Sequence, residues 1–158
     1  MNIKLSDNFY LNEFTKSDTA VRLGIDNTPT THHLVNLKVL INKVLQPLRI
    51  LLDEVITVNS GYRSELLNTA VHGSKTSAHC RGEAADIECY SMSNHDLAKL
   101  ITEQYGFDQV ILEFYSESDP HAGWVHVSYV NERLNRKQIL IARKNSNNKI
   151  YYEEVTSL

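Results

Sequence analysis

The amino-acid sequence predicts an α+β fold, in which helices pack behind a small antiparallel sheet. Apolar residues recur every three or four positions between Leu34 and Leu52, which indicates one face of a long helix. Two short runs, 84–89 and 124–129, instead show the period of two that is typical of strands. Since helical and strand segments are mixed along the chain, a sheet with helices on one side accounts for their order.

The remaining segments complete this fold. The first thirty residues are rich in turns and predict a short helix, around 11–14 or around 19–23. The apolar face of the long helix is expected to be core and comprises Leu34, Leu37, Leu40, Ile41, Val44, Leu45, Leu48, Leu51 and Leu52. Pro47 should kink this helix, because proline removes a backbone donor. The sequence then predicts a strand over 55–59, a helix over 65–70 capped by Ser64, a helix over 94–104 capped by Ser91 or Ser93, a strand over 110–114, and a hairpin over 138–155.

Two histidines and an aspartate lie where the predicted strands can bring them together. Alternation places Asp86 and His126 on one face of their strands, so pairing these strands sets His126 beside Asp86. His79 then arrives from the loop before the first strand, where Gly82 allows a sharp turn. Three protein ligands leave the fourth position of a zinc ion open to water, which is typical of catalytic sites. The sequence therefore predicts a metallohydrolase that binds one Zn²⁺ per chain.

Several motifs carry a resemblance to a known family. Residues 77–86 read Ser-x-His-x-x-Gly-x-Ala-x-Asp, and Trp-x-His follows at 124–126. In these motifs the sequence resembles the zinc D-Ala-D-Ala carboxypeptidase and endopeptidase family (peptidase M15-like), which cleaves bacterial peptidoglycan. The resemblance covers most of residues 5–130 and includes Asn59-Ser60-Gly61-Tyr62-Arg63-Ser64, Asn68, Leu45-Gln46-Pro47-Leu48-Arg49 and Gly24-Ile25-Asp26-Asn27.

The resemblance implies a hedgehog-like or D-Ala-D-Ala-peptidase-like fold and assigns roles to individual residues. It implies that His79, Asp86 and His126 bind zinc and that Arg63 binds substrate or stabilises the transition state. A guanidinium suits a substrate carboxylate or a developing oxyanion. Ser77 and Trp124 are expected to line the substrate site.

The general base departs from the pattern of some relatives, which place an acid three residues before the last histidine ligand. Gly123 occupies that position here. Glu113 ends a predicted strand and faces the site if that strand neighbours the strand of His126. His121 and Asp119 are alternatives in the following loop. We expect Glu113 to be the base and His121 to assist in proton transfer or in the transition state.

The two cysteines, Cys80 and Cys89, lie on either side of Asp86. Cys80 is a rival zinc ligand beside His79, although adjacent residues rarely bind one ion with good geometry. A disulfide between the two cysteines is a second alternative. We expect free thiols, with Cys89 in the core and Cys80 near the site.

Length and composition predict one domain over residues 1–158, with no separate wall-binding domain. The net charge of -3 and the dispersed cations exclude a nucleic-acid footprint, and no apolar run is long enough for stable membrane insertion. The first residues lack the apolar core of a signal peptide. We therefore expect a monomer that is made in the host cytoplasm and acts on the cell wall or periplasm after release.

By resemblance, the expected function is hydrolysis of peptidoglycan stem peptides or cross-links by a phage or prophage lysis enzyme (endolysin). Two alternatives stay open. One is a zinc-binding structural or virion module without turnover, which the absence of an acid at Gly123 would fit. The other is a small D,D-dipeptidase or D,D-carboxypeptidase.

Overall fold

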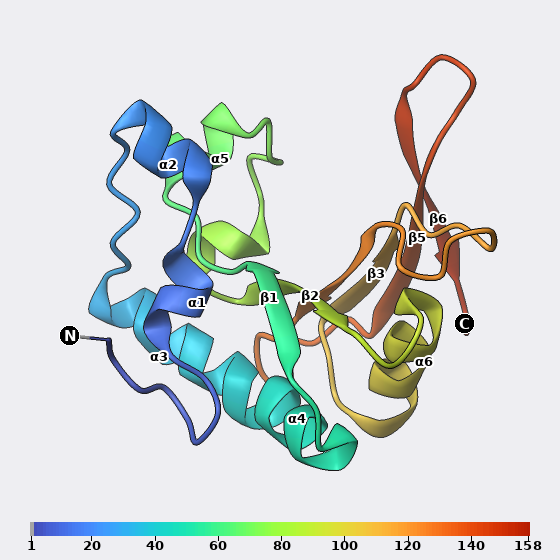
Figure 1. Ribbon diagram of the computed structural model, residues 1–158, viewed down its shortest axis with the longest axis horizontal. Coiled ribbons are helices and arrows are strands. Elements are labelled where there is room, and N and C mark those ends of the chain that lie inside the picture. Colours follow the sequence, from blue (N-terminus) through green and yellow to red (C-terminus); the bar gives the residue numbers. More distant parts are fainter. Residues whose placement is uncertain (1) are drawn as a thin grey trace.

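The computed structural model describes residues 2–158 and has the α+β architecture that the sequence predicts (Figure 1). The helical elements are α1 (Leu11–Thr15), α2 (Asp18–Leu23), α3 (Thr31–Leu40), η1 (Ile41–Leu45), α4 (Gln46–Leu52), α5 (Glu65–Ala70), η2 (Ala78–Arg81) and α6 (Asn94–Gln104). The strands are β1 (Ile56–Ser60), β2 (Ala84–Cys89), β3 (Gln109–Glu113), β4 (Trp124–Ser128), β5 (Gln138–Lys144) and β6 (Ile150–Val155).

The strands form one sheet in the order β1-β2-β4-β3-β5-β6. Neighbouring strands are antiparallel except for β3 and β5, which run parallel. In Figure 1 the helices α1–α5 gather on one side of the molecule, and the β5–β6 hairpin projects from the other. The predicted hairpin is therefore present, and it extends the sheet beyond β3.

One face of the sheet belongs to the hydrophobic core. Ile87, Leu112 and Val125 on the central strands are buried there, together with Leu97 and Ile101 of α6. The residues that alternate with them on β2, β3 and β4 include Asp86, Glu113 and His126 and point to the opposite face. This second face carries the candidate site.

The long helix contains a π-helical turn, η1, which ends two residues before Pro47. The backbone N–H of Gln46 bonds to the carbonyl of Ile41, five residues earlier, and this wider turn accommodates a proline that cannot donate. The expectation that Leu51 is core was wrong, since Leu51 is 56% exposed. Leu48, in the first turn of α4, belongs to the core, whereas Leu51, in its last turn, does not. Within residues 2–158 no helix is long and apolar enough to cross a membrane.

Other helix termini follow the local sequence. Both alternatives for the first helix occur, as α1 and α2. Ser64 caps α5 and Ser93 caps α6, each by accepting a backbone N–H three residues on. These caps fix where the chain enters α5 and α6.

Candidate metal centre

Three buried side chains, from His79, Asp86 and His126, meet on the face of the sheet opposite the core. His79 Nε2 lies 3.2 Å from Asp86 Oδ1 and 3.2 Å from His126 Nδ1. His126 Nδ1 lies 3.0 Å from Asp86 Oδ1. The three atoms thus form a nearly equilateral triangle.

The sheet places two of the three residues. Asp86 on β2 is paired directly with His126 on β4, so their side chains lie next to each other on one face. This is the arrangement that strand alternation predicts. Burial opposes the ionisation of Asp86, but the charges and hydrogen bonds of His79 and His126 outweigh it and hold the pKa of Asp86 well below its usual range.

His79 comes from the short helix η2, which several contacts fix beside the sheet. Ser77 caps η2 by accepting the backbone N–H of His79 at 3.3 Å. Gly82, with φ +71°, ends η2, and a Cβ there would lie 2.6 Å from the carbonyl oxygen of His33. Asn36 of α3 donates to the carbonyl of Arg81 at 2.8 Å. The first turns of α3 therefore hold the segment that carries His79.

The imidazole of His79 is oriented by the backbone of β1. Its Nδ1 lies 2.6 Å from the carbonyl oxygen of Gly61, the residue after β1. When the ring donates Nδ1–H to this carbonyl, Nε2 turns a lone pair toward Asp86 and His126. Metal-binding histidines commonly have such a hydrogen bond on the other nitrogen.

The donor set fits a zinc ion. Ligand distances of about 2.0–2.1 Å place two ligands of a tetrahedral ion about 3.3 Å apart, close to the edges of the triangle. When the imidazole rings of His79 and His126 are neutral, at most one of the three atoms, His126 Nδ1, carries a hydrogen. One hydrogen cannot satisfy all three close contacts between these acceptor atoms. A positive charge between the three atoms would relieve their mutual repulsion. His79 Nε2, Asp86 Oδ1 and His126 Nδ1 would hold it.

Glu113 is the last residue of β3, the strand that neighbours the strand of His126. It is paired with Trp124, two residues from His126, and is only 8% exposed. Burial raises the pKa of Glu113 to about 7; the charge on His126 opposes this rise, and the negative charge of Asp86 adds to it. Glu113 is thus a carboxyl group beside the cluster, with a pKa suited to proton transfer near neutral pH.

Gly123 has no room for a side chain. Its φ is +72°, and a Cβ there would overlap the carbonyl oxygen of Glu113. Asn94, fully buried at the start of α6, donates to the carbonyls of both Ala122 and Gly123, at 3.1 and 3.2 Å. The acid that some relatives place at this position therefore cannot be accommodated by this backbone, whereas Glu113 lies directly alongside.

Arg63 follows β1 and is held from both sides by Asn27. The Asn27 amide donates to the carbonyl of Tyr62 at 3.1 Å, and its Oδ1 accepts the backbone N–H of Ser64 at 2.7 Å. The backbone N–H of Arg63 donates to the carbonyl of His79 at 3.2 Å. Within residues 2–158 no carboxylate lies within ion-pair distance of the Arg63 guanidinium.

Sequence patterns did not predict the role of Asn27, although the residue lies in a segment that resembles the family. Its partners are backbone groups far along the chain, and no periodicity reports such contacts. The only signal in the sequence was the resemblance of the segment Gly24-Ile25-Asp26-Asn27. The structure explains that segment as the support of Arg63.

The other expected site residues lie at different distances from the cluster. Trp124 shares its face of β4 with His126 and packs edge-to-face on Phe114, with ring centroids 5.5 Å apart. His121 lies in the exposed loop before β4 and stacks on Tyr90. Asp119 accepts the backbone N–H of His121 in the same loop. Among residues 2–158, no hydrogen bond or ion pair connects His121 or Asp119 to the three clustered residues.

Both cysteines are free thiols, as expected. Cys89 is buried and Cys80 is partly exposed. Cys80 does not belong to the cluster of His79, Asp86 and His126. Burial raises the pKa of both thiols, so burial disfavours the thiolate that metal binding requires.

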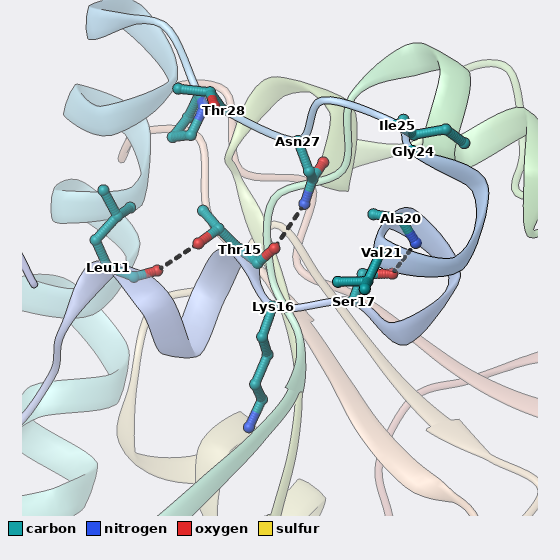
Figure 2. A pocket seen from close by; sticks show the side chains of 11 residues that line it. Leu11, Thr15, Lys16, Ser17, Ala20, Val21, Gly24, Ile25, Asn27 and Thr28 are labelled. Carbon is teal, nitrogen blue, oxygen red and sulfur yellow. Dashed lines mark hydrogen bonds between the residues drawn. The ribbon is translucent and has the colours of Figure 1, made fainter.

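A separate pocket lies between α1, α2 and the loop that leads to α3 (Figure 2). Figure 2 shows Asn27 donating to the carbonyl of Thr15, at 2.9 Å, beside this pocket. None of the clustered residues lines it. The pocket is therefore distinct from the candidate metal centre.

Comparison with known proteins agrees with the geometry of the site. The family model described as Peptidase M15 matches residues 7–128, a range that contains the whole cluster. No curated protein matches the chain. The family match and the buried His–Asp–His cluster together support a zinc-dependent metallopeptidase. Because the match covers more than half of the 158 residues, the chain belongs to the peptidase M15 family.

Proposed function

We propose that this zinc peptidase hydrolyses peptide bonds in the stem peptides or cross-links of bacterial peptidoglycan. The observation that carries the proposal is the position of Glu113, a buried carboxyl group beside three residues that suit one zinc ion. Bound zinc supplies Lewis acidity to the scissile carbonyl and lowers the pKa of water. The protein must then supply proton transfer and substrate binding.

Glu113 is the proposed general base. Its carboxylate accepts a proton from the attacking water and then delivers it to the nitrogen of the leaving amine, which would otherwise leave as an unstable anion. The pKa of about 7 lets the same group act in both steps near neutral pH. The alternative of a zinc-binding module without turnover rested on the absence of an acid at Gly123. Glu113 provides an acid from the neighbouring strand, so that absence no longer favours the alternative.

Arg63 is the proposed anchor for substrate. Its guanidinium has no internal carboxylate partner among residues 2–158, and stem peptides carry carboxylates near their scissile bonds. We assign Trp124 to the wall of the substrate site. Ser77 caps η2, and we propose that it also contacts the substrate. His121 remains a proposed helper, and it would have to approach the substrate from the exposed loop.

Digestion of purified peptidoglycan tests the proposal directly. Protein loaded with zinc should release peptide fragments, and a chelator should stop the release until zinc is restored. Mass spectrometry of the new amino termini identifies the bond, and products confined to free dipeptides or terminal D-alanine would favour the dipeptidase or carboxypeptidase alternative. Zinc binding without fragments from any of these substrates would contradict the proposal.

Substitution of single acidic residues distinguishes Glu113, the proposed base, from Asp119 in the loop that follows β3. Glu113→Gln should lose nearly all turnover, of the order of the 100-fold or more that general acid–base catalysis contributes, while it retains zinc. Asp119→Asn, in the exposed loop, is the matched control and should keep activity. Full activity in Glu113→Gln would exclude Glu113 as the base.

We also propose that the enzyme acts on the wall of a phage-infected host after release from the cytoplasm, as a monomer. The support for this setting is the resemblance to peptidases that cleave peptidoglycan. Expression in a bacterial host, with and without a membrane pore protein, provides the test. Lysis should require both the pore and an intact Glu113, and lysis without the pore would contradict the proposed route.

A further inference from the structure

The C-terminal hairpin lies outside the family match but beside β3, the strand that carries Glu113. The match ends at Ser128, whereas β5 and β6 follow it and extend the sheet from β3. Figure 1 shows the hairpin on the outer side of the sheet, next to β3. Any side chain that this hairpin places on the site face is therefore an addition to the part of the site that the family defines.

The strand register brings Tyr152 to the site face. Glu113 on β3 is paired with Ala142 on β5, and Ala142 is paired with Tyr152 on β6. Side chains at directly paired positions lie on the same face of a sheet. Because Ala142 carries only a methyl group, it leaves the space between Glu113 and Tyr152 open to the long tyrosine side chain. Tyr151, the neighbouring residue, points to the other face.

Electrostatics agree with this placement. Burial raises the pKa of the Tyr152 phenol, and the negative charges of Glu113 and Asp86 raise it further. The phenol therefore lies within electrostatic range of both carboxylates and keeps its proton at neutral pH. About half of Tyr152 remains exposed, so its hydroxyl is available as a hydrogen-bond donor.

A cation continues the same surface beyond Glu113. Trp124, paired with Glu113, contacts the ring of Phe114, and Lys144 Nζ lies 5.3 Å from the centre of that ring. Lys144 also follows Ala142 by two residues on β5, which places it on the site face. Phe114, Ala142 and Lys144 line a pocket at this end of the sheet. Within residues 2–158 no carboxylate forms an ion pair with Lys144.

We propose that Tyr152 and Lys144 form a substrate subsite beside Glu113, which holds a carboxylate-bearing part of the substrate peptide on the side of the C-terminal hairpin. The phenol donates a hydrogen bond to the peptide, and the ammonium group pairs with the carboxylate. The subsite adjoins Glu113, and the Lys144 ammonium group has no carboxylate partner among residues 2–158. We therefore expect an acidic peptide as the occupant. The inference rests on the proposed peptidase function.

Kinetics with matched variants test the subsite. Tyr152→Phe and Lys144→Gln should each raise KM about tenfold for a soluble stem peptide, with little change in kcat. Tyr151→Phe and Lys149→Gln, elsewhere on the hairpin, should leave KM unchanged. When the carboxylates of the peptide are converted to amides, Lys144→Gln should no longer differ from the unsubstituted protein. A merely structural lysine would not respond to this change of substrate.

The results separate failure of the subsite from failure of the proposed function. Unchanged KM in both Tyr152→Phe and Lys144→Gln would overturn the subsite, and so would equal effects in all four variants. If the unsubstituted protein cleaves no stem peptide, the proposed function fails, and calorimetric titration of the peptide into each variant replaces the kinetics. Weaker binding only in Tyr152→Phe and Lys144→Gln would then still support the subsite, and equal binding in all variants would overturn it.

Discussion

The two candidate ligands on strands and the candidate ligand on the short helix η2 are held by different means. Asp86 and His126 are fixed by one direct pairing between β2 and β4. His79 depends on separate contacts from Ser77, Gly61 and the start of α3. The sheet thus supplies a preformed pair, and several individually small interactions hold η2, which carries the third candidate ligand.

Removal of a candidate ligand from a strand should have the largest effect on the site. Asp86→Asn replaces the anionic member of the candidate cluster of His79, Asp86 and His126, so zinc affinity should fall by more than the roughly 100-fold associated with loss of an outer hydrogen-bond partner. Glu88→Gln, two residues further along the same face of β2, is the control and should retain zinc. Calorimetric titration measures both affinities. Unchanged affinity in Asp86→Asn would exclude Asp86 as a ligand.

The two buried carboxyl groups on the sheet should respond to pH in opposite directions. Asp86, with its lowered pKa, stabilises the fold above its ordinary pKa of 3.8, and this contribution is lost as the pH falls. Glu113 keeps its proton in the folded state up to about pH 7, whereas the unfolded chain releases it near 4.5. Between pH 4.5 and about 7 the folded protein therefore binds more protons than the unfolded chain. Its free energy of unfolding without metal should decrease as the pH rises through this range, by about 3 kcal/mol in total.

Denaturant unfolding in the presence of a chelator measures this dependence. Glu113→Gln should remove the decrease between pH 4.5 and about 7, and Glu117→Gln, in the exposed loop, should preserve it. The same decrease in Glu113→Gln and in the unsubstituted protein would show that Glu113 is ionised throughout this range.

The support of His79 on η2 can be tested at Gly82. An alanine there is strained at φ +71° and also approaches the carbonyl of His33, so η2 should shift and zinc affinity should fall roughly tenfold. Gly24 has a similar φ of +65° with no atom near the added Cβ. Gly24→Ala should therefore lower the unfolding free energy by about 1 kcal/mol and leave zinc affinity unchanged. Equal zinc affinities in the two variants would contradict this account of η2.

The smallest effect is expected at Asn27, which supports Arg63 without touching the cluster. Asn27→Ala removes the hydrogen bonds to Thr15, Tyr62 and Ser64, so KM for a stem peptide should rise several-fold at unchanged zinc affinity. Asn12→Ala, which loses a hydrogen bond to Asn2 at the surface, is the control. A loss of zinc in Asn27→Ala would indicate that the residue supports the metal centre instead.

The difference between local strand pattern and contacts that are distant in sequence also explains what the sequence could predict. Alternation in β2 and β4 was sufficient to put Asp86 and His126 on the site faces of their strands, and the assumed pairing of these strands is confirmed; Ser64 was sufficient to begin α5. The parallel pairing of β5 with β3 was not predicted, because local alternation does not determine which distant strand is the neighbour. The contacts of Asn27 and the position of Tyr152 were missed for the same reason.

The overlap between position 123 and the backbone of Glu113 restricts how this enzyme can change. A carboxylate at position 123 and a carboxylate at the end of β3 are alternative solutions that a single backbone cannot combine. Introducing Asp or Glu in place of Gly123 would displace the strand end that presents the existing acid, before any new one became useful. A change from one arrangement to the other must therefore remodel the β3–β4 connection as a whole, and single substitutions along that route would pass through inactive proteins.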